Sequence, residues 1–301
     1  MKLAITGGTG FVGSRLIALA TEAGDEVAAL TRRPRKDGEK LTWIDGSLED
    51  RDALQRLVRE ADAIIHVAGV ISASGAAGFE KGNVAGTLAL LAAATSSGVR
   101  RFVHVSSLAA REPALSLYGA SKAKSEELVR RSGLDWAIVR PPAVYGPGDR
   151  ETLELFKAAR IGLVPLPPAG RLSMIHVDDL GRLLLALAAP HAPSKLVLEP
   201  DDGRPGGYTH KEFARMLAEA QGRRAFSFAV PGGLLRLGAR ADRLLRRDRA
   251  KLTPDRAAYF CHPDWVSNPA AHPDPTLWQP QVPTAEGLAA TADWYCRQGW
   301  L

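Results

Sequence analysis

Cysteine, long apolar stretches and metal-binding clusters are scarce in this sequence of 301 residues, and each scarcity excludes a class of protein. Two cysteines, Cys261 and Cys296, are too few for a disulfide framework or a structural zinc site. No apolar run approaches the roughly 20 residues that a membrane-spanning helix needs. The seven histidines are scattered without the spacing of metal ligands, so we expect no bound metal.

The amino terminus also lacks the regions of a signal peptide, because Met1-Lys2 leads directly into the strand-like Leu3–Ile5 and then into glycines. We therefore expect a cytoplasmic protein without integral membrane association. The hydrophobic fraction of 46% and the charged fraction of 24% are those of an ordinary globular protein. The length admits two domains, or one large α/β domain with a smaller addition.

The net charge of +6 is concentrated in the segment 232–251. Seven basic and two acidic residues there give a net charge of +5, and leucines are interleaved with them, which predicts a basic amphipathic helix. We favour a solvated helix face that packs on its leucines; peripheral binding to an acidic partner or an anionic membrane is the second interpretation. The sequence has neither the Cys/His spacing of a zinc finger nor a basic stripe rich in aromatic residues, so we expect no nucleic-acid partner.

Short apolar segments alternate with helical segments through the first 140 residues. Strands that are nearly continuously apolar are typical of a parallel sheet covered by helices on both faces. The pattern predicts an α/β fold with a Rossmann-type doubly wound parallel sheet. The predicted strands are Lys2–Thr6, Glu26–Leu30, Leu41–Ile44, Ala63–Val67, Phe102–Ser106 and Trp136–Arg140, and the predicted helices are Phe11–Ala23, Arg51–Arg59, Gly86–Ser96 and Tyr118–Arg131.

Proline and glycine become frequent after Pro141, and one further strand–helix unit follows at Ser173–Ala189. We expect a dinucleotide-binding domain at 1–165, to which 171–190 returns, and a smaller substrate or cap domain at 191–301. Either a monomer or a homodimer is compatible with this layout.

A glycine-rich turn links the first strand to the first helix. Gly7, Gly10 and Gly13 have the spacing G-x-x-G-x-x-G. Gly7 permits the tight turn, Gly10 allows the backbone to approach a pyrophosphate, and Gly13 lets the helix pack closely on the strand. With a strand before it and a helix after it, this motif predicts a dinucleotide site whose phosphates lie at the helix amino terminus.

The end of the second strand lacks the acid that usually holds the ribose 2′-hydroxyl of NAD. The sequence there is Ala29-Leu30-Thr31-Arg32-Arg33. An arginine pairs with a 2′-phosphate through charge-assisted hydrogen bonds. We therefore favour NADP(H) over NAD(H), with Arg32 as the first candidate ligand and Arg33 as a second candidate or a solvated charge.

Tyr118 and Lys122 are spaced i and i+4 and so share one face of a predicted helix. A neighbouring ammonium lowers the pKa of a phenol, and the lysine can also bind ribose hydroxyls. Ser107, with Ser106 as a weaker candidate, follows the end of a strand and can hold a substrate oxygen. These residues predict an acid–base group of Tyr118, Lys122 and Ser107.

Seven short motifs along the chain match the pattern of one enzyme family. They are TGGTGFVG at 6–13, HVAG at 66–69, NVAGT at 83–87, VSSLAA at 105–110, YGASK at 118–122, RPPAVYGPGD at 140–149 and IHVDDL at 175–180. With these motifs the chain resembles the extended short-chain dehydrogenase/reductase superfamily, which includes NAD(P)-dependent epimerase/dehydratase-like enzymes. The resemblance implies a Rossmann core, a C-terminal substrate domain, a nicotinamide dinucleotide and redox chemistry at carbon.

The resemblance also assigns roles to single residues. Tyr118 would be the general acid–base, Lys122 its activator and a ribose ligand, and Ser107 the holder of the substrate oxygen. His176 and Asp178 would organise a strand-to-helix turn. The implied cofactor contacts are Gly7, Gly10, Phe11, Val12 and Gly13 at the pyrophosphate, Leu48 near the adenine, Ala68 and Gly69 near the central ribose, and Pro141 to Val144 beside the nicotinamide.

Three features depart from the family pattern. Ser47 stands where many members have an aspartate that contacts adenine, and only eleven positions separate Ser107 from Tyr118. Pro142-Ala143 replaces the asparagine with which nucleotide-sugar members often meet the substrate diphosphate. We favour an NADP(H)-dependent reductase or dehydrogenase of a small carbonyl or secondary alcohol. The alternatives are a nucleotide-sugar epimerase/dehydratase that retains its NAD(P) and a non-catalytic dinucleotide-binding accessory subunit.

Overall fold

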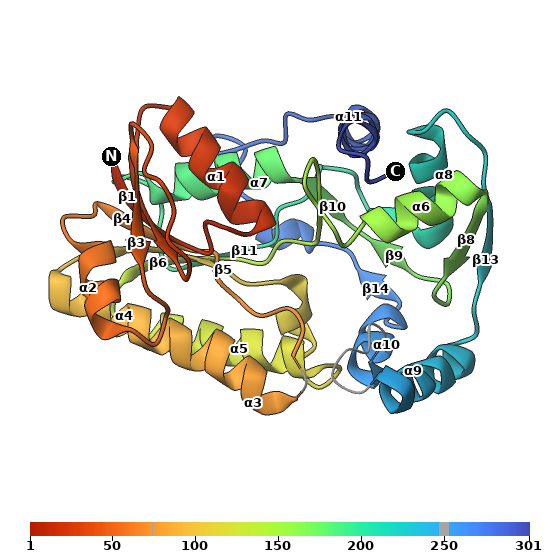
Figure 1. Cartoon of the computed structure of the whole chain (residues 1–301), viewed down its shortest axis with the longest axis horizontal. Helices are drawn as coiled ribbons and strands as arrows, with labels where there is room; N and C mark the ends of the chain where they lie inside the picture. The colour runs from red at the N-terminus through yellow and green to blue at the C-terminus, as the bar shows by residue number, and fades with distance from the viewer. Residues whose placement is uncertain (74, 247–252) are drawn as a thin grey trace. The chain divides into compact units, whose positions relative to one another are not determined.

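The chain divides into two compact units, which are described separately (Figure 1). The computed structural model describes residues 1–73, 75–246 and 253–301, without the side chains of Arg243, Leu245, Arg246 and Pro254. The first unit comprises Met1–Arg140, Leu180–Glu199 and Pro273–Gln279; the second comprises Pro141–Asp179, Pro200–His272 and Pro280–Leu301. The domain boundary that the sequence suggested at residue 165 lies inside the second unit.

A seven-stranded sheet of order β11-β6-β5-β4-β1-β2-β3 forms the centre of the first unit, and every neighbouring pair is parallel. Six of these strands have the order of a classic dinucleotide-binding fold, which confirms the predicted Rossmann-type architecture. The strands are β1 (Lys2–Thr6), β2 (Glu26–Thr31), β3 (Leu41–Asp45), β4 (Ala63–His66), β5 (Arg101–Val105), β6 (Asp135–Val139) and β11 (Leu196–Leu198).

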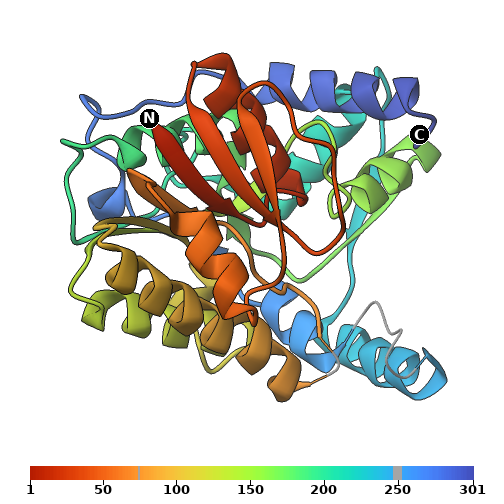
Figure 2. The ribbon, with the colours of Figure 1, turned by 60° about the vertical axis from the view of Figure 1, so that its left-hand side comes forward.

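Helices cover both faces of this sheet (Figures 1 and 2). Helices α1 and α7 lie on one face, while α2, α4 and α5 lie on the other and bury an aliphatic core against the strands. The helical segments are α1 (Phe11–Glu22), α2 (Arg51–Val58), α3 (Ala76–Phe79), the π-helix η1 (Glu80–Ala85), α4 (Gly86–Ser97), the 3-10 turn η2 (Leu108–Arg111), α5 (Leu117–Arg131) and α7 (Val177–Ala188).

Side-chain caps fix where two of these helices begin. The carboxylate of Asp50 accepts a hydrogen bond from the backbone N–H of Ala53 at 3.0 Å, so α2 begins at Arg51 as the sequence indicated. Ser116 likewise accepts from the N–H of Gly119 at 2.9 Å. This cap starts α5 at Leu117, one residue before the predicted start.

The second unit combines short strands with helices around its own apolar core. Strand β10, which the sequence indicated near Ser173, pairs with β7 in this unit and is not part of the large sheet. The elements are β7 (Ala143–Tyr145), α6 (Leu153–Ile161), β8 (Leu163–Leu166), β9 (Arg171–Leu172), β10 (Met174–His176), β12 (Tyr208–Thr209), α8 (His210–Glu219), β13 (Phe226–Ala229), α9 (Gly232–Arg246), α10 (Pro254–Phe260), β14 (Asp264–Trp265), the 3-10 turn η4 (Pro269–Ala271) and α11 (Thr284–Arg297).

The basic segment forms the helix α9 as far as Arg246, and its remainder, 247–251, lies outside the described residues. The expectation that its leucines pack inward is wrong for three of them. Leu234, Leu237 and Leu244 are 58%, 60% and 80% exposed, respectively. The buried side of α9 is instead marked by Ala239, which has no exposed surface.

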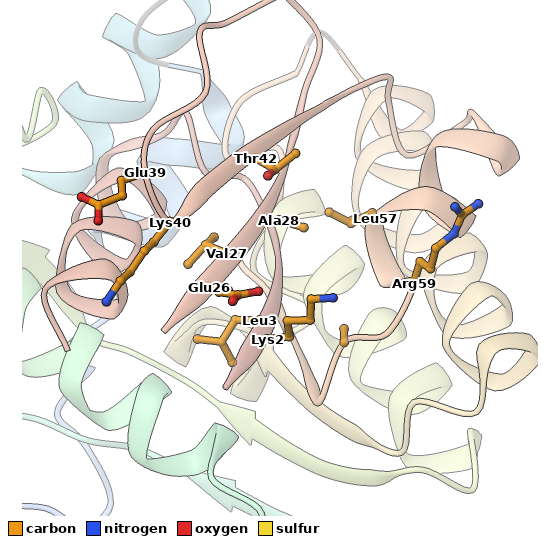
Figure 3. A pocket seen from close by; sticks show the side chains of 11 residues that line it. Lys2, Leu3, Glu26, Val27, Ala28, Glu39, Lys40, Thr42, Leu57 and Arg59 are labelled. Atoms are coloured by element: carbon orange, nitrogen blue, oxygen red, sulfur yellow. The ribbon is translucent and has the colours of Figure 1, made fainter. Parts of the chain in front are cut away.

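A small pocket opens beside the first residues of β1, β2 and β3, lined in part by Lys2, Glu26 and Lys40 (Figure 3). These positions are at the amino ends of parallel strands. Ligands of doubly wound sheets bind beyond the carboxyl ends of the strands, so this pocket is on the wrong side of the sheet for catalysis. No helix in the described part of the chain is long and apolar enough to cross a membrane.

Candidate functional site

The glycine turn after β1 has a geometry that side chains would destroy. Gly7 has a φ of +76°, and a Cβ there would lie 2.6 Å from the backbone nitrogen of Ala68. A Cβ at Gly13 would lie 2.1 Å from the carbonyl oxygen of Gly7, so α1 packs directly on the turn. Gly10 precedes α1 without a side-chain cap, which leaves N–H groups of the first helical turn, at Phe11 and Val12, for an anion. This cradle fits the pyrophosphate of a dinucleotide.

Ala68 and Gly69 follow β4 and lie beside this turn. The N–H of Ala68 donates to Thr6 Oγ1 at 3.3 Å, and the same hydroxyl is 2.6 Å from Nδ1 of His66. Nε2 of His66 is 3.0 Å from Thr87 Oγ1. Burial, with the charge of Lys122 as a second cause, lowers the pKa of His66 to about 3. His66 is therefore neutral at pH 7 and holds the end of β4 in place.

Helix α5 presents Tyr118, Lys122 and Glu126 at successive i+4 positions. Nζ of the buried Lys122 donates to the carbonyl oxygen of Val105 at 2.8 Å. A Cβ at Gly69 would lie 3.8 Å from the same Nζ, so the lysine reaches the strand end that borders the glycine turn. Burial lowers the pKa of Lys122 to about 8, against the opposing charge of Glu126.

The half-buried Tyr118 is hydrogen-bonded through its phenol to Ser107. Burial raises the pKa of Tyr118, and the bond to Ser107 opposes the increase. The sequence analysis expected a lowered pKa from the neighbouring Lys122, but in this structure the net change is upward. Desolvation of the phenolate outweighs the other effects here.

The two serines after β5 have different surroundings. The hydroxyl of Ser106 is buried and donates to Glu126 Oε1 at 2.6 Å. Ser107 is only partly buried, begins the turn η2, and contacts the Tyr118 hydroxyl. This placement favours Ser107 over Ser106 as the group that meets a substrate oxygen.

Asn83 is a site residue to which the sequence analysis gave no role. Its side chain accepts from the N–H of Val70 at 2.6 Å, donates to the carbonyl of Val70 at 3.0 Å, and donates to Ser121 Oγ at 2.8 Å. It therefore ties the segment after Gly69 to α5. The signal in the sequence was the NVAGT motif, and the structure adds that Asn83 lies in a π-helix, a feature often found at functional sites.

Glu126 anchors α5 to the end of the sheet. Arg140 contacts this fully buried carboxylate twice, at 2.7 and 2.8 Å, and Arg130 contacts it at 2.8 Å. Glu199 pairs with Arg140 at 3.3 Å. Burial raises the pKa of Glu126, but the hydrogen bonds from Arg140 and Ser106 outweigh burial and bring it below the ordinary value.

The other predicted site residues lie as follows. Arg32 and Arg33 are exposed just after β2, where Thr31 Oγ1 donates to the carbonyl of Arg33 at 2.8 Å. Leu48 is partly buried and packs against Gly86. Pro141 and Val144 belong to the second unit, and their placement beside a nicotinamide stays a prediction.

His176 and Asp178 also lie in the second unit, where Nδ1 of His176 accepts the N–H of Asp178 at 3.2 Å. This bond stabilises the turn from β10 into α7, in keeping with the structural role expected of them. No group of three or more metal-ligating side chains occurs among the residues that the structure describes.

Comparison with known proteins identifies relatives over the full length. Residues 3–196 match the NAD dependent epimerase/dehydratase family. The ceramide reductase of Caulobacter vibrioides is 38% identical over 99% of this chain and 96% of its own length. The 2-alkyl-3-oxoalkanoate reductase of Stenotrophomonas maltophilia is 30% identical over 96% of this chain and 97% of its own length.

A ketoreductase of Stigmatella aurantiaca that acts on a 4-farnesyl quinoline oxide is 31% identical over 77% of this chain and 76% of its own length. Among solved structures, MoeE5 in complex with UDP-glucose and NAD superposes with a TM-score of 0.76 at 23% identity, covering 99% of both chains. At this identity the superposition supports the fold alone.

Proposed function

The chain belongs to the NAD dependent epimerase/dehydratase family, and on that premise we propose that it is an NADP(H)-dependent reductase or dehydrogenase of a carbonyl or secondary alcohol. The observation that carries the proposal is the hydroxyl pair of Ser107 and Tyr118 one helical turn from Lys122, which borders the glycine cradle. A non-catalytic dinucleotide binder needs the glycine cradle and a ribose ligand, but it does not need a phenol hydrogen-bonded to a serine on the same side as that lysine.

The residues of the first unit supply binding and proton transfer. The pyrophosphate would be held by the glycine cradle of Gly7, Gly10 and Gly13 and by the N–H groups of Phe11 and Val12. The central ribose would be held by Ala68, Gly69 and Lys122. The bound nicotinamide would supply or accept the hydride. Because burial raises its pKa, the phenol of Tyr118 is protonated at pH 7, the form that a proton donor needs in the reduction direction.

In that direction Ser107 donates a hydrogen bond to the substrate carbonyl and polarises it. The carbonyl carbon receives the hydride, and Tyr118 delivers a proton to the oxygen, which gives the alcohol and a phenolate. The ammonium of Lys122 on the same helix face stabilises the phenolate until solvent returns the proton. Asn83 and Glu126 position the helix on which these groups stand.

The substrate proposed is a ketone borne by a lipophilic molecule. The relatives support this class, because their names include a ceramide, a farnesylated quinoline oxide and an alkylated oxoalkanoate. The test is oxidation of NADPH by the purified protein with a panel of long-chain 3-oxo amides, steroid ketones and UDP-glucose. Turnover of UDP-glucose with a stoichiometrically retained dinucleotide would favour the epimerase/dehydratase alternative instead.

Arg32 is proposed to select NADP(H). Replacing Arg32 by alanine is expected to weaken NADPH binding tenfold or more, because one charge-assisted contact to the 2′-phosphate contributes about 1.5–3 kcal/mol. NADH has no 2′-phosphate, so its affinity should be unchanged. Fluorescence titration of both cofactors measures the effect.

Arg33→Ala serves as the matched control, since it removes the same charge at the neighbouring exposed position. We expect this variant to bind NADPH within a factor of about 3 of the wild type. Equal affinities of the wild-type protein for NADPH and NADH would refute the cofactor assignment.

A further inference from the structure

The second unit carries most of the exposed large apolar side chains among the described residues. Within the described residues, eight of its large apolar side chains, all between positions 161 and 260, are exposed. They are Ile161, Leu163, Phe226, Phe228, Leu234, Leu237, Leu244 and Phe260. Exposed apolar side chains that gather on one face, rather than standing singly, mark an interaction surface.

The exposed leucines of α9 form a single stripe. Leu237 and Leu244 follow Leu234 by three and ten positions, and at 3.6 residues per turn the three side chains fall within one quarter of the helix circumference. Ala239 lies on the opposite side and is buried. The helix packs beside α10 at the periphery of the second unit (Figures 1 and 2), so the stripe is the side of α9 turned away from its own core.

Arginines follow one border of this stripe. Arg236 and Arg240 are exposed and, at one turn from each other, lie between the leucines and the buried side. The sequence continues the spacing of these arginines with Arg243 and Arg247, whose side chains are outside the described residues. Within the described side chains of α9, the exposed Arg236 and Arg240 therefore lie beside an apolar stripe.

The strand that precedes α9 adds aromatic surface. Phe226 and Phe228 alternate along β13 and therefore face the same side of a two-stranded sheet. Their partners in β8 are Leu163 and Pro165, which are also exposed. The chain runs from β13 through Val230 and Pro231 into α9 (Figure 1).

We propose that α9, with the sheet face of β8 and β13 before it, docks the protein on the surface of an anionic lipid membrane. A membrane interface takes up both features at once: the leucines enter the acyl boundary while the arginines meet the anionic headgroups. An acidic protein partner would account for the arginines, but not for leucines exposed on the outer side. For the lipophilic substrate class, a point that rests on the proposed function, such docking brings the enzyme to the membrane that holds its substrate.

The experiment is sedimentation of the full chain with vesicles of phosphatidylglycerol and phosphatidylcholine, beside vesicles of phosphatidylcholine alone. We expect binding to the anionic vesicles that weakens at least fivefold between 0.1 and 0.5 M NaCl, because salt screens the charges. The triple variant Leu234→Ser, Leu237→Ser, Leu244→Ser should bind at least tenfold more weakly. The double variant Arg236→Glu, Arg240→Glu should lose binding by a similar factor.

Two matched controls come from the first unit. Leu88→Ser removes a leucine of α4 that is 55% exposed, for comparison with Leu237→Ser at 60%. Arg51→Glu with Arg59→Glu changes the net charge as much as the double variant of α9. Both controls should bind vesicles like the wild type, and circular dichroism verifies that every variant is folded.

Tyr118→Phe should bind vesicles as tightly as the wild-type protein, so the result does not depend on whether the proposed reaction is correct. The proposal is overturned if the wild-type protein stays in the supernatant when the anionic vesicles are sedimented. It is also overturned if the triple serine variant binds these vesicles as tightly as the wild type. The wild type could instead form an oligomer and bind no vesicles, while the triple serine variant is monomeric. That result would assign the stripe to self-association and would also overturn the proposal.

Discussion

Tyr118→Phe is expected to reduce the rate of ketone reduction by about 10²–10⁴-fold, the usual contribution of a general acid. Phenylalanine keeps the ring, which packs against Phe79 with 6.2 Å between ring centroids, and removes only the hydroxyl that contacts Ser107. The affinity for NADPH should therefore change little. Steady-state rates and a cofactor titration on the same preparations measure the two effects.

Lys122→Ala provides the contrasting variant, because Lys122 is placed to act on both the phenol and the ribose. We expect it to lower the rate and to weaken cofactor binding together. If Tyr118→Phe retained full activity, the assignment of the proton donor would fail, whatever the behaviour of the lysine variant.

Glu126→Ala is expected to reduce the free energy of unfolding by about 3 kcal/mol, because it leaves the guanidinium of Arg140 partly buried with a broken network. This is the lower end of the range for a broken buried pair, since Glu199 remains as a partner of Arg140. The urea midpoint, measured by circular dichroism, reports the change.

The adjacent Glu127 supplies the control. Both carboxylates pair with an arginine at i+4, but the Glu127 pair with Arg131 is mostly exposed. Glu127→Ala should therefore cost about 1 kcal/mol or less. If both variants lost a similar free energy of unfolding, burial of Glu126 would not explain its contribution to stability.

The pH dependence of the Glu126 contribution follows from its lowered pKa in the folded protein. A carboxylate of this kind stabilises the fold above the unfolded-state pKa of about 4.3, and the contribution disappears as the pH falls through the lower folded-state pKa. The stability difference between the wild type and Glu126→Gln should therefore be constant from pH 6 to 8 and shrink below about pH 4. A difference that grows on acidification would contradict this sign.

Short-range sequence patterns predicted the strands and helices of the first unit. The apolar runs and the caps of Asp50 and Ser116 are short-range features, and they place the strands and helices within one or two residues. The short strand β11 was missed because its three residues show no periodicity before they pair with β6. Strand β10 was recognised, but its partner was not, because pairing with β7 is a choice between distant segments.

The candidate site was predictable where one helix or one turn carries the residues. Spacing alone put Tyr118 and Lys122 on one helix face and the three glycines in one turn. Asn83 escaped notice because its role depends on Val70 and Ser121, which are distant in sequence. The upward shift of the Tyr118 pKa was not predicted for a related reason, since burial is a property of the packed protein.

The sequence by itself determined the elements of the Rossmann-type sheet, the glycine cradle and the spacing of the acid–base residues, because each depends on backbone conformation and on neighbours within about one helical turn. Tertiary structure decided which groups are desolvated and which are exposed. Packing buried Lys122 and the Glu126–Arg140 pair, and it left Leu234, Leu237 and Leu244 of α9 in solvent, although their periodicity is that of a packed face. The physical reason is that desolvation depends on what the rest of the fold places over a side chain, and no local pattern contains that information.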